Sequence, residues 1–173
     1  SPAALNAEIR GSKYAHRFFR LTTQMRVQAG ADYVEFVRAL LRDEAPSLPD
    51  LGEYELRLFD DLGDMRDAIR RKDAEVGLSR LVAGYAWDWV SRKNSDAFDI
   101  ELDGERLRWN GTDKDWINSN GSLEEVGSIH TVQGYDLNYA GVIIGPDLRL
   151  DPVTGRIVAD RENYRDKKGK ENT

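Results

Sequence analysis

The chain has 173 residues, of which 40% are hydrophobic and 32% are charged, and this composition fits one folded domain and excludes a wholly disordered protein. Its 25 basic and 31 acidic side chains give a net charge of −6, which argues against a free-standing, high-affinity DNA-binding protein, because phosphate contacts need clustered Lys and Arg. The sequence has no Cys and no apolar run near the roughly 20 residues that span a bilayer, so we expect a cytoplasmic protein without a membrane partner.

The first part of the chain is predicted to alternate between strands and helices. Residues 1–16 form an N-terminal segment, and the short apolar run 18–21 then enters a strand. Apolar residues recur at helical spacing over residues 32–42 and again over residues 62–76, each run being followed by a Pro or Gly that stops a helix. Residues 54–60, between these helices, alternate between apolar and polar side chains, which is typical of a strand.

The middle of the chain is predicted to form strands. Residues 79–85 are apolar enough for a core strand. Two alternating runs, 98–102 and 105–109, flank Asp103-Gly104, and Asp-Gly in such a position indicates a β-hairpin. A further strand is expected over residues 126–129, after a loop rich in Asn, Gly and Ser.

A helix is expected to open at Thr131 and run to residue 137, followed by the most apolar strand, residues 139–145. A second hairpin is predicted around residues 151–158, and residues 161–173 form a charged, flexible tail. Strands that alternate with helices predict an α/β fold with a mainly parallel sheet over residues 17–160, in which the first hairpin is an insertion or an antiparallel edge. Functional residues are then expected in loops after the carboxyl ends of strands.

The segment 127–136 is the most informative stretch for function. It places hydroxyl, imidazole and amide groups directly after a strand, and Gln133 and Gly134 are expected in the first turn of a helix, where backbone N–H groups attract anions. Ser128 and Thr131 would donate hydroxyl hydrogen bonds to a phosphate, and Gly134 would let another backbone approach closely. From the spacing alone, an ordinary strand–turn–helix with polar caps is an equally good interpretation.

This segment resembles motif V of superfamily 1 helicases. That motif runs Ser or Thr, a hydrophobe, His, two residues, Gln or Lys, Gly, one residue and an acid. The residues that match it in order and spacing are Ser128, Ile129, His130, Gln133, Gly134 and Asp136. The resemblance implies nucleic-acid contacts for Ser128, His130, Thr131 and Gln133, and nucleotide contacts for Gly134 and Asp136. Asp136, which stands where many members carry Glu, would accept a hydrogen bond from the nucleotide sugar.

Residues 21–26 resemble motif IV of the same helicases, a Leu followed by polar residues and a terminal Arg. The resemblance implies that Gln24 and Arg26 bind the nucleotide and that Arg26 is catalytic, as an arginine finger. A guanidinium suits this role because it stays charged and stabilises charge that spreads over phosphoryl oxygens. Met25 stands where many members carry an aromatic residue. Judged without the resemblance, an Arg after a strand is more often an ordinary surface residue.

The chain as a whole is similar to a bacterial helicase-like family related to the helicase region of Schlafen proteins, through residues 24–26, 85–87 and 129–136. The resemblance implies a three-layer RecA-like domain of the P-loop NTPase superfamily, acting as the second half of an ATP-dependent helicase or translocase. The implied partners are single-stranded DNA or RNA and the P-loop RecA-like domain of the same protein. The implied cofactors of the intact protein are ATP and Mg²⁺.

The sequence contains no Gly-x-x-x-x-Gly-Lys-Ser/Thr and no recognisable motif VI, so this chain alone is expected neither to hydrolyse ATP nor to hold a cofactor or metal. The alternative function is a non-motor nucleic-acid-binding or regulatory module on a degenerate RecA scaffold. A third hypothesis is a metal-dependent nuclease that uses Asp99 and Glu101, which lie two apart on a predicted strand.

Aromatic and basic residues supply further candidates for nucleic-acid contact. The three aromatic residues within 85–89 would suit a platform for single-stranded bases, and so would Trp109 and Trp116 beside a polar loop. For both sets, packing is the more common role. The basic stripe within residues 66–72 would lie on the helix 62–76, and such stripes are usually solvated faces.

Overall fold

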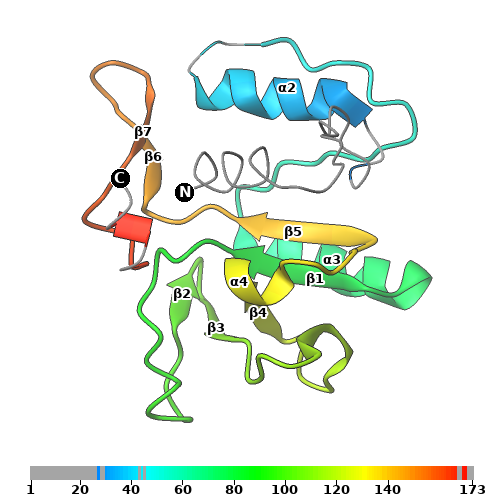
Figure 1. The fold of residues 1–173 in the computed structure, drawn as a ribbon, viewed down its shortest axis with the longest axis vertical. Helices are drawn as coiled ribbons and strands as arrows, with labels where there is room; N and C mark the ends of the chain where they lie inside the picture. The colour runs from blue at the N-terminus through cyan, green and yellow to red at the C-terminus, as the bar shows by residue number, and fades with distance from the viewer. Residues whose placement is uncertain (1–26, 28–29, 43, 45, 167–168, 171–173) are drawn as a thin grey trace, which may run out of the picture.

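The computed structural model describes residue 27 and residues 30–42, 44, 46–166 and 169–170 (Figure 1). The predicted strand at 18–21 and the residues Gln24 and Arg26 therefore lie outside the described residues. The described part is an α/β structure in which α3 (Leu62–Val76) packs against the central sheet, while α2 (Gly30–Leu41) lies beyond the outer strand of that sheet in Figure 1.

The central sheet has five strands in the order β2-β3-β4-β1-β5. Their bounds are β1 Ser79–Ala83, β2 Ile100–Leu102, β3 Glu105–Trp109, β4 Glu125–Ser128 and β5 Tyr139–Ile143. β1 is parallel to both β4 and β5, and β3 is parallel to β4, whereas β2 is antiparallel to β3. The predicted α/β class with a mainly parallel sheet is confirmed, and the first hairpin is its antiparallel edge.

A separate two-stranded sheet follows the central one. It pairs β6 (Leu148–Leu150) with β7 (Ile157–Ala159) in antiparallel register, with Leu150 opposite Ile157. The second predicted hairpin is therefore confirmed, with its strands placed on either side of the turn at residues 151–156. This hairpin leaves the sheet after β5 and projects to one side of it in Figure 1.

The core lies between α3 and the sheet. Leu81 on β1 and Val126 on β4 are fully buried, as expected for neighbouring central strands of a parallel sheet. Ile69 on α3 packs over β5 at Gly141, where an added Cβ atom would stand 2.9 Å from Ile69 Cγ1. Gly141 therefore allows helix and sheet to approach closely.

The two predicted helices in the first half are confirmed, and α3 has the predicted bounds. The side chain of Asp61 caps its first turn by accepting a hydrogen bond from the N–H of Asp64 at 2.9 Å. Gly77 ends the helix with φ of 71°, a conformation that glycine adopts most easily. The β2–β3 turn is confirmed as well, since Asp103 and Gly104 have φ angles of 51° and 80°, which suit a two-residue hairpin.

Two predicted elements are wrong. Residues 54–60 form no strand, because no described strand completes a hydrogen-bonded ladder with them, and Leu58 is 93% exposed. The helix predicted over residues 131–137 is instead α4 (Ile129–Val132), which begins directly after β4. It ends early because the backbone is already extended at Gln133, with ψ of 118°, and Gly134 then takes a φ of 102°.

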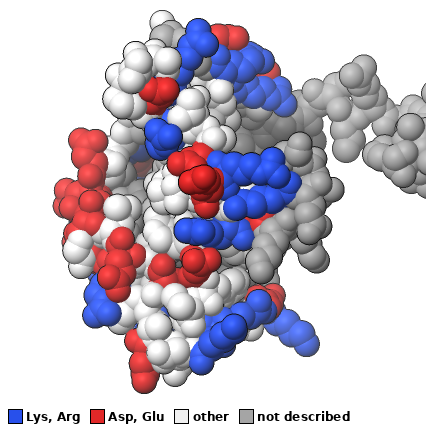
Figure 2. Space-filling model, turned by 90° about the vertical axis from the view of Figure 1, so that its left-hand side faces the viewer, with Lys and Arg blue, Asp and Glu red and all other residues white. Residues whose placement is uncertain are grey.

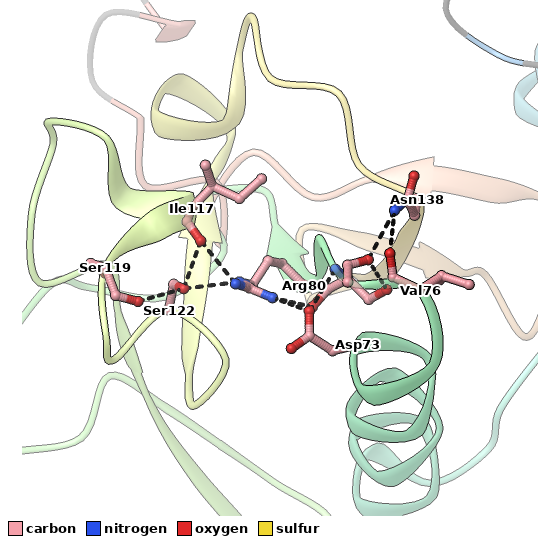
Figure 3. A network of polar contacts seen from close by, with 9 residues as sticks. Asp73, Val76, Arg80, Ile117, Ser119, Ser122 and Asn138 are labelled. Atoms are coloured by element: carbon pink, nitrogen blue, oxygen red, sulfur yellow. Dashed lines mark hydrogen bonds and ion pairs between the residues drawn. The ribbon is translucent and has the colours of Figure 1, made fainter.

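Arg80 connects the start of β1 to the loop between β3 and β4 (Figure 3). Its guanidinium donates to Asp73 Oδ1 on α3 at 2.6 Å, to Ser122 Oγ at 2.9 Å and to the Ile117 carbonyl at 2.8 Å. Ile117 belongs to the short 3₁₀ helix η1 (Trp116–Asn118). The buried arginine thus holds in place the loop that brings Trp116 under β4.

Candidate functional site

The motif V segment begins where β4 ends and crosses to β5. Ser128 is the last residue of β4 and is only 1% exposed. Its Oγ lies 2.9 Å from Thr131 Oγ1, and its N–H donates to Asn110 Oδ1 at 3.2 Å. In this conformation Ser128 holds the turn together, and its hydroxyl does not face solvent.

The rest of the segment reaches the surface. His130, Gln133, Gly134 and Asp136 are exposed, and Thr131 is half-buried. Gln133 and Gly134 follow α4 and do not open it, so the predicted anion site in the first turn of a helix is wrong for these two residues. Gly134 has open space around the position of a Cβ atom, so another molecule can approach its backbone there.

Gly127 allows Trp116 and Val132 to pack closely against the backbone of β4. A Cβ atom at this position would lie 2.5 Å from Trp116 Cζ3 and 2.5 Å from Val132 Cγ1. The Trp116 indole N–H donates to Glu125 Oε2 at 2.7 Å. Trp116 is therefore packed under β4. Trp109, the last residue of β3, is 1% exposed in the core, so these two residues have the packing role and form no platform.

Three other aromatic residues follow β1 and lie beside motif V. Tyr85, Trp87 and Trp89 are all half-buried and line an open pocket of about 530 Å³. The Tyr85 ring lies 6.4 Å from the Trp89 ring and 5.5 Å from the His130 imidazole, measured between centroids. Because β1 and β4 are parallel, their carboxyl ends bring the aromatic segment and His130 to the same edge of the sheet.

Asp99 anchors the chain at Ser91, just after the three aromatic residues. Its buried carboxylate accepts hydrogen bonds from the Ser91 N–H at 2.8 Å, the Ser91 hydroxyl at 2.6 Å and the Trp109 N–H at 2.9 Å. Glu101 is exposed and pairs with Arg106. The two carboxylates of the nuclease hypothesis therefore have separate partners, and the described residues contain no cluster of three or more side chains suited to hold a metal ion.

Charged residues line the rim of the aromatic pocket. The Arg92 guanidinium lies 5.0 Å from the centroid of the Trp89 ring and 3.7 Å from Asp113 Oδ2. Arg165 donates its backbone N–H to the Tyr85 carbonyl at 2.6 Å, and so residues 165–166 of the predicted tail lie against the pocket. Asp166, the next residue, lies 3.4 Å from His130 Nε2.

A family model for the Schlafen group 3 DNA/RNA helicase domain matches residues 5–173. The chain belongs to this family. It is also 34% identical over 121 residues to the uncharacterized protein YPL245W of Saccharomyces cerevisiae, an alignment that covers 67% of this chain. The chain spans 26% of that relative's length. No solved structure matches the chain.

The predicted basic stripe of this helicase-like domain is largely neutralised by acidic partners. Arg66 pairs with Glu105 and Glu124, and Arg70 pairs with the same Glu124. The hydrogen bond from Arg70 lowers the pKa of the Glu124 carboxyl, so this residue stays ionised against the two arginines. The stripe therefore joins α3 to β3 and to the loop before β4.

The surface of the Schlafen group 3 domain carries no uniform charge on the side shown in Figure 2. Clusters of Lys and Arg side chains lie over the middle of this face, and Asp and Glu side chains lie among them and along one edge. None of the helices that the structure describes is long and apolar enough to span a membrane.

Proposed function

We propose that this domain is the second, RecA-like half of an ATP-dependent nucleic-acid helicase or translocase. The observation that supports the proposal best is the position of motif V at the carboxyl end of β4, with His130, Gln133 and Asp136 exposed on one segment. In α/β folds with a parallel sheet, this edge is where ligands bind. Membership of a helicase-domain family agrees with this assignment.

The exposed part of motif V fits contact with a nucleotide. Gly134 leaves open space beside its backbone, and Asp136 presents an exposed carboxylate that can accept a hydrogen bond from a sugar hydroxyl. ATP, when held between this domain and a P-loop domain, would supply the free energy of phosphoryl transfer. Arg26 is assigned to the terminal phosphate through its match to motif IV, where a fixed positive charge stabilises the transition state.

The same segment would couple the nucleotide to the nucleic acid. Thr131 and Gln133 lie between His130, beside the aromatic pocket, and Gly134 and Asp136, so a displacement at one end of the segment is transmitted to the other through a few residues. Ser128, buried and hydrogen-bonded to Thr131, would hold the segment rigid during this motion. Closure of this domain and the P-loop domain around ATP would then shift this domain along the nucleic-acid strand.

The decisive experiment measures ATP hydrolysis by the intact protein, with and without single-stranded DNA or RNA. Arg26→Ala should lower the strand-stimulated rate by about 10³-fold or more, as expected for an arginine finger. Arg71→Ala, at an exposed position on α3, removes the same charge and should leave the rate unchanged.

A motif V variant completes this experiment. Gln133→Ala should abolish stimulation by the strand while basal hydrolysis persists, since this side chain is assigned to the nucleic acid. Asn120→Ala, an exposed amide in the loop before β4, is the matched control. Absence of hydrolysis under every condition would refute the motor and favour the non-motor binding module.

A further inference from the structure

The open pocket after β1 has the shape and chemistry of a base-binding site. Tyr85, Trp87 and Trp89 remain half-buried although they lie on a core of buried aromatic and aliphatic side chains. Trp109 supports two of them from inside, with ring centroids 5.7 Å from Tyr85 and 6.0 Å from Trp89. We propose that this pocket binds one nucleobase of a single-stranded nucleic acid by stacking on these rings.

The rim carries two arginines, Arg92 and Arg165, and two carboxylates, Asp88 and Asp166. Arg92 is well exposed, and its pairing with Asp113 at 3.7 Å is that of a loose surface ion pair. Arg165 lies 3.9 Å from Asp88, an equally loose pair. Both guanidiniums can therefore turn to a phosphate beside a bound base. A cationic ligand in an aromatic cage is disfavoured, because Arg92 already occupies a cation–π position on Trp89.

The walls of the pocket are held in place before any ligand arrives. Asp99 anchors the segment at Ser91 through two hydrogen bonds, and the backbone of Arg165 is bonded to that of Tyr85. Trp87 rests against Gly145, where an added Cβ atom would stand 2.9 Å from its ring. A site formed in advance loses little conformational entropy on binding, which favours affinity.

The pocket also lies beside motif V, the segment that the proposed function assigns to the nucleic acid. The His130 ring, which belongs to motif V, forms part of its wall and lies 5.5 Å from the Tyr85 ring. The identity of the ligand as a nucleic-acid strand rests on the proposed function, whereas the stacking site rests on the geometry of the pocket.

The test uses short single-stranded DNA and RNA oligonucleotides labelled with fluorescein, and measures their binding to the chain by fluorescence anisotropy without ATP. Each oligonucleotide is compared with one of the same length that carries abasic positions, which keep the phosphates and remove the stacking partner. We expect Kd to rise on the order of tenfold for the abasic probe. Equal Kd values, or no binding of either probe, would overturn the inference.

Variants assign the effect to this pocket. Trp87→Ala should raise Kd for the intact oligonucleotide and reduce its advantage over the abasic one. Arg92→Gln should raise Kd for both probes by a similar factor, because it removes a phosphate contact. Arg71→Gln is the charge-matched control: α3 runs towards the start of β1, so position 71 lies away from the carboxyl edge, and Kd should stay within about twofold. Unchanged discrimination in Trp87→Ala would overturn the assignment.

The outcomes also separate this inference from the proposed function. Strand-stimulated ATP hydrolysis by the intact protein, combined with equal binding of intact and abasic probes, would overturn the base pocket and leave the motor standing. Clear discrimination between the probes without any hydrolysis would support the pocket and overturn the motor.

Discussion

Arg80 shows how one buried side chain can determine the position of a loop that is distant in the sequence. It is 8% exposed, and three of its four hydrogen bonds join α3 to the loop that carries Trp116. Its removal would leave the Asp73 carboxylate with only the Ser79 N–H as donor, and the Ile117 carbonyl with only the Ser122 hydroxyl, so the Asp73 charge would lose its counter-ion in a poorly solvated place. We expect Arg80→Met to lower the free energy of unfolding by about 3–5 kcal/mol in urea denaturation. Arg71→Met, on the exposed side of α3, should change it by less than about 0.5 kcal/mol.

The ion pair between Arg80 and Asp73 makes the stability of the fold depend on pH. Burial opposes ionisation of Asp73, but hydrogen bonds from the Ser79 N–H and from Arg80 outweigh it and hold the pKa of this carboxyl below its ordinary 3.8. A carboxyl with a lowered folded-state pKa stabilises the fold above its unfolded pKa, and this contribution is lost as pH falls through the folded pKa. When the pH is lowered below about 4, the urea concentration at the unfolding midpoint should therefore decrease more steeply for the wild type than for Asp73→Asn.

An exposed carboxylate on the same helix serves as the reference for this pH dependence. Asp67→Asn should keep the steep fall of the wild type, because the Asp67 side chain is 62% exposed and its partner, Arg70, also pairs with Glu124. If Asp73→Asn and the wild type lose stability in parallel as the solution is acidified, Asp73 contributes nothing to the pH dependence.

At the scale of elements, the sequence predicts best what is decided locally. The bounds of α3 follow from Asp61 and Gly77, and the first hairpin follows from Asp103 and Gly104, because each of these residues acts on its own neighbours. Alternation over residues 54–60 does not show whether another strand is present to complete a ladder. Motif V was predicted to follow a strand, but its helix ends early through the extended backbone at Gln133, which the sequence pattern does not show.

The sequence indicated aromatic residues that could form the pocket, but it did not show which of them are buried instead. The sequence shows four Trp residues in similar polar surroundings, and their roles differ through contacts made over long distances along the chain. Trp116 is buried because Gly127 leaves room for its ring, and the pocket is completed by Arg165, 80 positions after Tyr85. No local pattern reports such contacts.

Gly127 provides a test of how β4 carries motif V. Gly127→Ala would place a methyl group 2.5 Å from both the Trp116 ring and Val132, so these must move, and overpacking of this kind lowers stability by about 1–3 kcal/mol. Gly84→Ala, just after the parallel strand β1, would meet only Asp147 Oδ2 at 3.8 Å and is the matched control. Equal thermal midpoints for the two variants would show that the Trp116 contact does not constrain the strand.

The net charge of the chain bears on the proposed binding of a nucleic acid. A net charge of −6 repels a phosphate backbone over long range, and the arginines and the lysine of α3 that pair with Glu105, Glu124 and Glu55 are partly neutralised. Lys and Arg clusters on the face shown in Figure 2 are interrupted by acidic side chains. Binding would therefore depend on stacking and on a few cations more than on an extended basic surface.

This balance has a measurable consequence in the salt dependence of binding. If the strand meets the domain mainly through Arg92 and Arg165, binding neutralises two phosphates, and log K should fall with log salt with a slope of about −1.4 for a single strand. Titrations of the labelled oligonucleotide at about 50–200 mM salt measure this slope. Arg92→Gln should make it shallower by about 0.7, whereas Arg71→Gln should leave it unchanged. A slope near −4 would require roughly six phosphate contacts and would show that an extended basic surface holds the strand in place of the pocket.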